Sequence, residues 1–511
     1  MDREGDLSFP NNVVYAAKQV CSLGRLFFAC MVAGGIQYAW ALQLSLLSPY
    51  SQSLGIPHHH VSLTWICGPI AGFVVPPIVG YYSDRCTAMM GRRRPFIVAG
   101  CLVICLSVML IGLSADIGRL LGDTKEHCTT STGPRWAATA VYIVGFWFLN
   151  FANNAAQGPA RALMADLSAA GNYMPSVGQA IFCGWMAIGN VLGYMAGADS
   201  EWHVWLPWLK TTACCEACAN LKGAFLTAVI VIIISTSITM YIAEEKQLDN
   251  AYVEASSGRR GCICGFGDFF KSLKNLPPSM VKVLAVTAVT WLAWFPFIQY
   301  GTDWMGREIY HGEPQGPKVA VYYAGVREGA IGLLLSSICL LAAAFNTPHL
   351  CGRLTSRVVW SLSNFILFGI MTAMVILGLV STEGYNASFT AGLTGPDPKL
   401  RVIALSLFAL IGIPQAVLFT VPWAVASKVA DDGGQGLAIG VLNIAIVVPQ
   451  VLIIVLTVGP IDKAFGKGNT PAFGIGCAFA FICAILALIL LPKTRVTRGM
   501  STATAMASRE G

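Results

Sequence analysis

The feature that most constrains this chain is a series of long apolar stretches joined by short polar connections. We place twelve of them, each close to the roughly 20 residues that a helix needs to cross the hydrocarbon core of a bilayer. Only 12% of the 511 residues are charged, against about 25% in soluble domains. The sequence therefore predicts an all-α membrane protein with twelve transmembrane helices. The stretches are approximately 25–47, 62–82, 95–114, 137–158, 176–198, 223–242, 283–301, 323–345, 359–381, 402–424, 437–459 and 472–492.

Basic residues cluster in connections that share one side if every stretch crosses the membrane once. Positive charge marks the cytoplasmic side, so both termini are expected in the cytoplasm. The net charge of +7 is then a topology signal, and no nucleic-acid partner is expected. Residues 1 to 23 lack the apolar run of a cleavable signal peptide. The plasma membrane is the expected location, with the vacuolar membrane as the alternative. The clusters contain Arg85, Arg92, Arg93, Arg94, Lys246, Arg259, Arg260, Lys271, Lys274, Lys493, Arg495 and Arg498.

The longest inner connection divides the chain into two halves of six stretches. A weak repeat supports the division, because Pro159-Ala-Arg161 ahead of Gln179 corresponds in position to Pro422-Trp-Ala424 ahead of Gln435. Parallel six-span halves indicate a transporter of the major facilitator type, with its site between two six-helix bundles near the midplane. The expected parts are a cytoplasmic tail (1–24), the first bundle (25–242), a linker (243–282), the second bundle (283–492) and a second cytoplasmic tail (493–511).

Polar residues interrupt the fourth apolar stretch at regular spacing. Asn150, Asn154, Gln157 and Arg161 follow the pattern i, i+4, i+7, i+11, which places them on one face of a helix. The first and last are about 16 Å apart along the axis. A membrane helix with such a stripe is expected to line the protein interior or an aqueous path. The alternative is that the amides are helix-packing contacts and the arginine is an ordinary loop charge.

The connection between the second and third stretches contains Gly-Tyr-Tyr-Ser-Asp-Arg followed by Gly-Arg-Arg-Arg-Pro. Glycine permits a tight turn, and aspartate can accept hydrogen bonds from arginine or from a helix N-terminus. This order resembles the loop motif of the major facilitator superfamily, which implies a conformational latch without substrate contact. The alternative is a plain cluster of positive charge. The residues concerned are Gly80, Asp84, Arg85, Gly91, Arg92 and Arg93.

Longer runs resemble one family over nearly the whole chain. These include Gly34-Gly-Ile-Gln-Tyr-Ala-Trp-Ala-Leu-Gln-Leu-Ser-Leu-Leu-Ser-Pro49, Gln157-Gly-Pro-Ala-Arg-Ala-Leu-Met-Ala-Asp166 and Thr302-Asp-Trp-Met-Gly-Arg-Glu308. The sequence resembles plant sucrose transporters, a sucrose:proton symporter family of the glycoside-pentoside-hexuronide type. The resemblance implies transport of sucrose and related glucosides, usually with a proton. It also implies that the binding and coupling residues fall on His58, Arg161, Asp303, Arg327 and Glu328.

A sugar site needs hydrogen-bonding groups and flat aromatic faces. The first stretch supplies Gln37 and Trp40, and the seventh supplies Trp294. Arg327 and Glu328 form an adjacent charged pair in the eighth stretch, which is costly at membrane depth unless the pair has a task. The alternative for this pair is snorkelling at the outer interface.

Two positions depart from the pattern of the family. The family usually has aspartate, taken as the proton carrier, where this chain has Asn150, and it has aspartate again where this chain has Gly301. Asparagine can form hydrogen bonds but cannot titrate. Two hypotheses follow: a symporter with its proton on Glu328, Asp303 or Asp166, or a facilitator that moves sucrose down its gradient. A sucrose sensor without transport is a third possibility.

No enzyme, metal site or cofactor is expected, apart from a proton as the possible coupling ion. The consecutive residues His58, His59 and His60 have poor spacing for shared metal ligation. The predicted outer connections contain a glycosylation sequon at Asn386. They also contain Cys128, Cys214, Cys215 and Cys218, so Cys128 either forms a disulfide with one of the other three or remains a free thiol.

Overall fold

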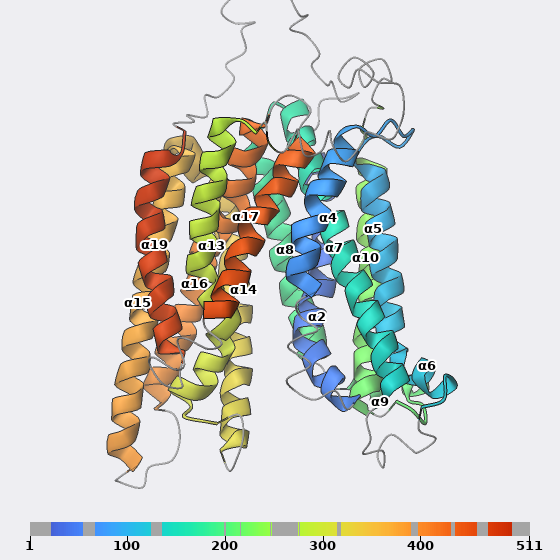
Figure 1. Cartoon of the computed structure of the whole chain (residues 1–511), viewed down its shortest axis with the longest axis vertical. Helices are drawn as coiled ribbons and strands as arrows, with labels where there is room; N and C mark the ends of the chain where they lie inside the picture. The colour runs from blue at the N-terminus through green and yellow to red at the C-terminus, as the bar shows by residue number, and fades with distance from the viewer. Residues whose placement is uncertain are drawn as a thin grey trace, which may run out of the picture.

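In a computed structural model of the 511-residue chain, the described residues form a bundle of long helices (Figure 1). Among them, twelve helices have at least 18 residues, and each of these overlaps one of the twelve predicted stretches. The all-α prediction is therefore confirmed. The structure describes residues 22–54, 67–123, 135–198, 201–214, 216–245, 247, 274, 276–313, 318–389, 397–430, 435–456 and 469–492.

The first half of the chain supplies six of the long helices. Short elements lie before and between them in the described part of the chain. The elements are α1 (Leu23–Ala29), α2 (Val32–Ser53), α4 (Cys67–Asp84), α5 (Arg94–Gly112), α6 (Ser114–Leu120), α7 (Trp136–Ala170), α8 (Pro175–Ala198), α9 (Trp202–Trp205), the 3-10 turn η1 (Pro207–Leu209) and α10 (Glu216–Ile242).

The second half supplies the other six long helices, with proline inside four of them. Proline is tolerated in membrane helices because neighbouring helices and local adjustments satisfy the freed backbone groups. The elements are α13 (Pro278–Trp304), the π-helical turn η2 (Met305–Ile309), α14 (Val319–Arg353), α15 (Ser356–Phe389), α16 (Pro398–Val429), α17 (Gln435–Leu456) and α19 (Thr470–Leu490).

Each half has its own hydrophobic core. One cluster of buried side chains is drawn entirely from residues 26–243, and another entirely from residues 291–480. The two halves meet mainly where α4 packs on α17 and where α8 packs on α14 and α16. Figure 1 shows the two sets of helices side by side, with α4, α8, α14 and α17 near the middle. A site between the halves would therefore be lined by these helices and by α7.

The contacts between the halves include a very close backbone approach at Gly80 and Gly436. A Cβ on Gly80 would collide with the carbonyl oxygen of Gly436. Tyr81 packs beside them against Leu437 and Val441. Only glycine allows two helices to approach this closely, so these positions fix the α4–α17 contact.

Several predicted stretches differ in their bounds from the observed helices. Stretch 25–47 is broken by a turn at Cys30 and Met31 and continues to Ser53. Stretch 137–158 corresponds to α7, which continues to Ala170. The helix continues because Arg161 and Asp166 find polar partners within the protein and do not need water at a membrane boundary. Helix α15 likewise runs past its predicted end through Asn386, whose side chain lies outside the described residues.

Ten helices in the described part of the chain are long and apolar enough to cross a membrane by length and composition. Helices α4 and α7 are not among these ten. Helix α7 carries the stripe of polar residues, and α4 contains Pro76, Pro77 and polar residues near its end. Helices α4 and α7, which are the least suited to contact with lipid, are thus packed against other helices.

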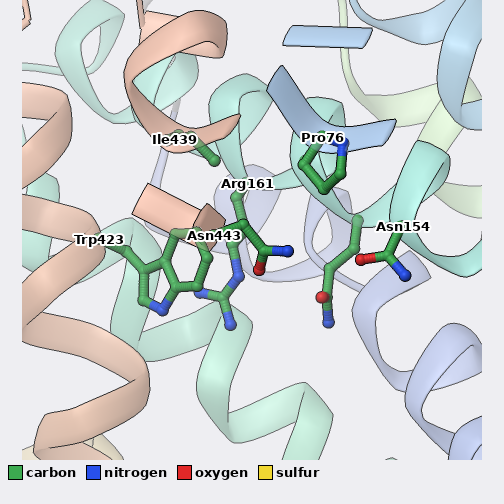
Figure 2. Close-up of a pocket in the computed structure, with 8 residues that line it drawn as sticks. Pro76, Asn154, Arg161, Trp423, Ile439 and Asn443 are labelled. Carbon is green, nitrogen blue, oxygen red and sulfur yellow. The ribbon is translucent and has the colours of Figure 1, made fainter. Parts of the chain in front are cut away.

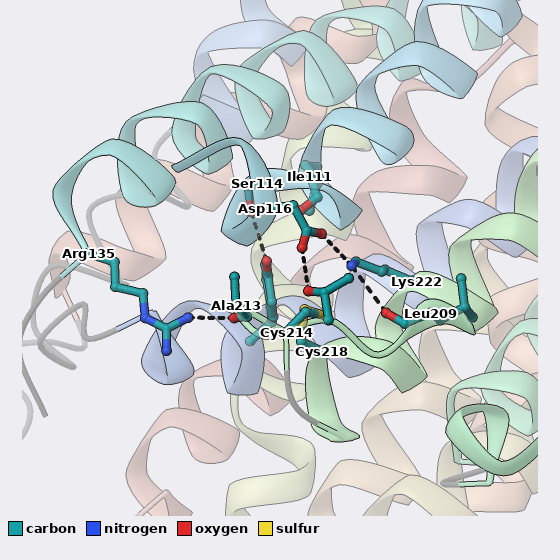
Figure 3. The surroundings of a disulfide bond; sticks show 11 residues. Ile111, Ser114, Asp116, Arg135, Leu209, Ala213, Cys214, Cys218 and Lys222 are labelled. Carbon is teal, nitrogen blue, oxygen red and sulfur yellow. Dashed lines mark hydrogen bonds and ion pairs between the residues drawn. A yellow bond between two sulfur atoms is a disulfide. The ribbon is translucent and has the colours of Figure 1, made fainter. Parts of the chain in front are cut away.

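The disulfide differs from the pairing predicted for Cys128. Cys214 is bonded to Cys218 across the start of α10 (Figure 3), which removes two of the three candidate partners. Cys128 and Cys215 lie outside the described residues. Beside the disulfide, Lys222 forms an ion pair with Asp116 and donates to the carbonyl oxygen of Leu209 at 3.3 Å. These contacts fasten the segment before α10 to the end of the first bundle.

Candidate functional site

A polar pocket lies between the two halves, at the contact of α7 with α4, α16 and α17. Helix α7 supplies Asn154, Gln157 and Arg161, three of the four residues of the predicted stripe. Figure 2 shows Arg161 and Asn154 directed toward this space, with Asn443 between them. The full lining is Pro76, Asn154, Gln157, Gly158, Arg161, Trp423, Ile439 and Asn443.

Arg161 is the only charged residue among those that line this pocket, and it is 1% exposed. Its Nη1 donates to Oε1 of Gln179 at 3.0 Å and to the carbonyl oxygen of Phe419 at 3.2 Å. Within the described residues it makes no ion pair, and its Nε has no hydrogen-bond partner. A buried guanidinium with unused donor capacity is costly unless a ligand supplies an acceptor.

Two aromatic rings enclose this guanidinium. The Arg161 Cζ atom lies 4.2 Å from the ring centroid of Trp423 and 4.5 Å from that of Phe182. Cation–π contacts of this kind stabilise a desolvated arginine in place of a carboxylate. Trp423 belongs to the second half and Phe182 to the first, so the guanidinium is held where the two halves meet.

The amides around Arg161 add uncharged hydrogen-bonding groups to the pocket. Asn443 on α17 donates to the carbonyl oxygen of Gly72 on α4 at 2.7 Å, a bond between the halves. Asn154 donates to the carbonyl oxygen of Asn150 at 2.9 Å, which leaves its own oxygen as an acceptor. Together these groups offer donors, acceptors and an indole face, which are the groups that bind a polyhydroxyl ligand.

Asn150 lies deeper in the first bundle and does not line the pocket. It is buried, its Nδ2 donates to the carbonyl oxygen of Phe146 at 2.8 Å, and its Oδ1 accepts from Gln43 at 3.4 Å. These contacts match the alternative considered for this residue, an amide that joins membrane helices. The stripe is therefore divided, with one packing residue and three pocket residues.

The predicted aromatic and amide residues of α2 and α13 also lie away from the pocket. Gln37 donates to Asn190 at 2.9 Å, and Trp40 is partly buried. Trp294 is 1% exposed and packs in the core of the second bundle, so its ring presents no face to a ligand in this structure. Its neighbour Trp291 comes nearer to the site, because its ring lies 6.3 Å from that of Phe419.

The adjacent charges in α14 separate from one another. Glu328 forms an ion pair with Arg401 of α16, whereas Arg327 is exposed and makes no ion pair within the described residues. Neighbouring residues on a helix point about 100° apart, which explains the separation. Arg327 precedes Leu341 by 14 residues and thus lies near the helix face that contacts Gly184 of the first half.

Asp303 lies near the end of α13 in a polar cluster of its own. It accepts from Arg307 Nε at 2.9 Å, from the Tyr322 hydroxyl at 2.6 Å and from Asn469 Nδ2 at 2.7 Å. Glu308 shares the asparagine with it. His58, the remaining predicted site residue, lies outside the described residues.

The loop motif forms a bridge between the halves. The carboxylate of Asp84 accepts from the backbone N–H groups of Gly436 at 2.9 Å and Leu437 at 2.8 Å, which are the first turn of α17. It also forms an ion pair with Arg93, which is fully buried. A carboxylate at a helix N-terminus is favoured by hydrogen bonds and by the helix dipole. Asp84 thus closes one end of the interface between the halves.

Asp166 and Glu245 complete this cluster on the side of the first half. Asp166 pairs with Arg92 at 2.8 Å and with Arg93 at 3.3 Å. Glu245 accepts from the backbone N–H of Arg93 at 2.9 Å. Burial raises the pKa of Glu245, and the Arg93 N–H opposes that rise. The cluster fixes Asp166 in a structural role here, away from the pocket.

Two other residues of the motif have different roles. Gly91 adopts φ = +100°, and a side chain there would meet Glu245, so glycine is required. The Arg85 Cζ atom lies 3.8 Å from the ring centroid of Tyr81, and within the described residues Arg85 makes no ion pair with the second half. The bridge therefore depends on Asp84 and Arg93, with Arg85 beside it.

Sequence reasoning missed the partners that come from distant parts of the chain. Trp423 was noted only as part of a repeat, and Phe182 was not singled out. The repeat was nevertheless a usable signal, because the two corresponding segments meet at Arg161 and Trp423. Glu308 and Asn469 had no local pattern that marked them.

Comparisons with known proteins agree with this architecture. The family model described as MFS/sugar transport protein matches residues 27–154. The sucrose transport protein SUT5 of Oryza sativa subsp. indica is 72% identical over 487 residues, which cover 94% of this chain and 90% of that protein. The sucrose transport protein SUT3 of Oryza sativa subsp. japonica is 53% identical, over 93% of this chain and 94% of that protein. Such identity over nearly full length places the chain among transport proteins and not among enzymes.

Solved structures share the fold at low sequence identity. The E. coli fucose:proton symporter FucP, in its N162A form, superposes with a TM-score of 0.59 at 12% identity, covering 91% of this chain and 98% of that one. A second FucP structure, described as a major facilitator superfamily transporter in the outward conformation, gives a TM-score of 0.56 over the same fractions. The fold is therefore that of the major facilitator superfamily, as the six-plus-six organisation predicted.

Proposed function

Because this chain belongs to the family of sucrose transport proteins, within the major facilitator superfamily, we propose that it carries sucrose across a membrane by alternating access. In this mechanism the two bundles rock about a central site, which faces one side of the membrane and then the other. The relatives supply the substrate in this proposal, and the geometry of the pocket supports it.

The observation that carries the proposal is the pocket that Arg161 lines together with amide side chains and an indole ring. A cationic substrate would be repelled by Arg161, whereas a sugar can use the amides, the indole face and the guanidinium Nε–H, which has no partner within the described residues. Sugar hydroxyls accept hydrogen bonds from guanidinium and amide N–H groups, and the C–H faces of sugar rings pack against indole. Sucrose bound beside Arg161 of the first half and Trp423 of the second would contact both bundles, so its binding would be linked to their relative motion.

The halves are joined at the end that carries Asp84, and this supports a state open at the opposite end. We assign that end to the cytoplasm on the basis of the positive charge of the Asp84 loop. Both termini are then cytoplasmic, and the site faces outward in the conformation described. We assign the protein to the plasma membrane, with the vacuolar membrane as the alternative.

We also propose that transport is coupled to a proton, carried by an acid other than residue 150. Asn150 cannot titrate, and its amide joins α7 to α2. Among the acids considered from the sequence, Asp166 is held by Arg92 and Arg93, and Glu328 by Arg401. Coupling adds about 2.3 kcal/mol per charge per 100 mV of membrane potential to the driving force.

Expression in oocytes tests these statements together. Sucrose-induced inward current that grows as external pH falls supports symport. Uptake of labelled sucrose without current supports the facilitator alternative, which Asn150 favours. If reconstituted protein binds sucrose but produces no flux into liposomes, the chain is a sensor and the transport proposal is wrong.

A further inference from the structure

A buried carboxylate that makes no ion pair within the described residues lies at the outer end of the second bundle. Glu308 is in η2, directly after α13, and it is 7% exposed. It accepts from the backbone N–H of Asn469 at 2.5 Å and from Nδ2 of the same residue at 3.4 Å. Within the described residues it makes no ion pair. Keeping such a carboxylate ionised is costly, whereas a protonated one is readily tolerated.

A second carboxylate lies on the same asparagine. Nδ2 of Asn469 donates to Asp303 at 2.7 Å as well as to Glu308 at 3.4 Å. Asp303 has Arg307 and the hydroxyl of Tyr322 as further donors. The guanidinium of Arg307 therefore pairs directly with Asp303 and makes no ion pair with Glu308. Two carboxylates this close repel one another when both are ionised, and one proton relieves that repulsion.

A donor without a partner in the described part of the chain lies near the same place. The indole N–H of Trp304 is fully buried and has no hydrogen-bond partner within the described residues. The position that a Cβ on Gly378 would occupy lies 3.2 Å from Trp304 Nε1, 3.3 Å from Thr470 Oγ1 and 3.8 Å from Glu308 Cβ. A buried donor of this kind in a native protein requires an explanation, and a binding site provides one.

The other charged groups near the cluster do not supply the missing positive charge. His311 shares a hydrogen bond of 3.0 Å with Ser381, and burial together with the charge of Lys318 lowers the pKa of this histidine to about 4. It is therefore neutral at physiological pH. Arg401 is occupied by its ion pair with Glu328. Tyr310 near that pair is neutral, because burial raises its pKa.

We propose that Glu308, with Asp303 and Asn469, forms the proton-binding site that couples sucrose transport to the proton gradient. This inference rests on the proposed function and names the acid that replaces a titratable residue at position 150. A proton from water on the outer side joins a carboxylate oxygen of Glu308, and it returns to water on the inner side after the bundles rock. No other bond is made or broken in this step.

The position of the cluster gives it a physical connection to the pocket. Helix α13 leads from Asp303 back to Trp291, about 18 Å along its axis. The ring of Trp291 lies against Phe419, whose carbonyl oxygen accepts from Arg161. Glu308 also holds the N-cap residue of α19. Protonation of Glu308 weakens that acceptor and so alters how α13 and α19 are joined at the outer end.

Calorimetry of sucrose binding to purified protein in lipid nanodiscs tests the proposal directly. Titrations in buffers of different ionisation enthalpy count the protons taken up with the sugar. We expect about one proton per sucrose for the unmodified protein and close to none for Glu308→Gln, with sucrose binding retained. Glu383→Gln, which alters an exposed carboxylate on α15, is the matched control and keeps the full count.

A proton count that is unchanged in Glu308→Gln overturns the assignment. If that variant does not fold, Asn469→Ser serves instead: losing the shared amide donor moves the midpoint of proton uptake to higher pH, and an unmoved midpoint contradicts the proposal. Sucrose binding and flux without proton uptake in the unmodified protein overturn the proton site but leave sucrose transport standing. Absence of sucrose binding and flux removes both.

Discussion

At the scale of single residues, the most informative side chain is Arg161, a buried cation held by aromatic rings in place of a carboxylate. We expect Trp423→Ala to raise the KM for sucrose roughly tenfold, because the cation–π contact contributes about 1–2 kcal/mol and the indole face is lost. Trp423→Phe keeps a ring and should stay close to the unmodified value. Labelled-sucrose uptake, normalised to surface expression, measures both. Equal KM values for the two variants would show that the ring is not part of the site.

Asn150 supports a second prediction at this scale. In Asn150→Asp, a protonated carboxyl can still donate to the carbonyl of Phe146 and accept from Gln43, whereas the ionised form loses that donor in a buried place. Uptake by this variant should therefore fall as external pH rises. The part of this pH dependence that comes from residue 150 is absent from the unmodified protein, because asparagine does not titrate. Asn154→Asp, on the pocket-facing side of the same helix, is the comparison. Identical pH profiles for Asn150→Asp and the unmodified protein would contradict this account.

At the scale of elements, the bridge between α4 and α17 determines how the halves close. Asp84→Ala leaves two N–H groups at the start of α17 without their acceptor, at a cost of about 1–3 kcal/mol. We expect the interface to open more often, so that the buried thiol of Cys183, which packs against Leu340 and Ala344, reacts faster with a maleimide.

Two comparisons make this measurement specific. Cys483 is a free thiol within the core of the second bundle and should keep its rate. Arg85→Ala changes a residue that stacks on Tyr81 and does not join the bridge, so it should leave the Cys183 rate unaltered. If Arg85→Ala accelerates Cys183 as much as Asp84→Ala, general destabilisation explains the effect and the bridge does not.

The elements also show how far the sequence alone could lead. Hydropathy predicted the twelve helices, because it depends on local composition, whereas a latch at Asp84 was implied by the resemblance of its loop to a known motif. Arg327 and Glu328 were paired from adjacency, yet helix geometry turns them apart and gives Glu328 to Arg401. Glu308 was overlooked because its partner Asn469 is 161 residues away. Partners separated by that distance meet only through the packing of α13 on α19, which no local pattern encodes.

At the scale of the whole molecule, the separate cores of the two bundles and their small contact clusters suit rigid-body rocking. Tyr81 and Leu437 pack together across the interface at the Asp84 end. In the double variant Tyr81→Cys with Leu437→Cys, an oxidised cross-link should prevent that end from opening, because transport requires the halves to separate there. Sucrose uptake should be lost on oxidation and return on reduction, while sucrose binding from the outer side persists. Each single-cysteine variant, oxidised in parallel, controls for the native thiols. Full uptake by a verified cross-linked protein would mean that the sugar passes without separation at this end, and alternating access about this interface would be wrong.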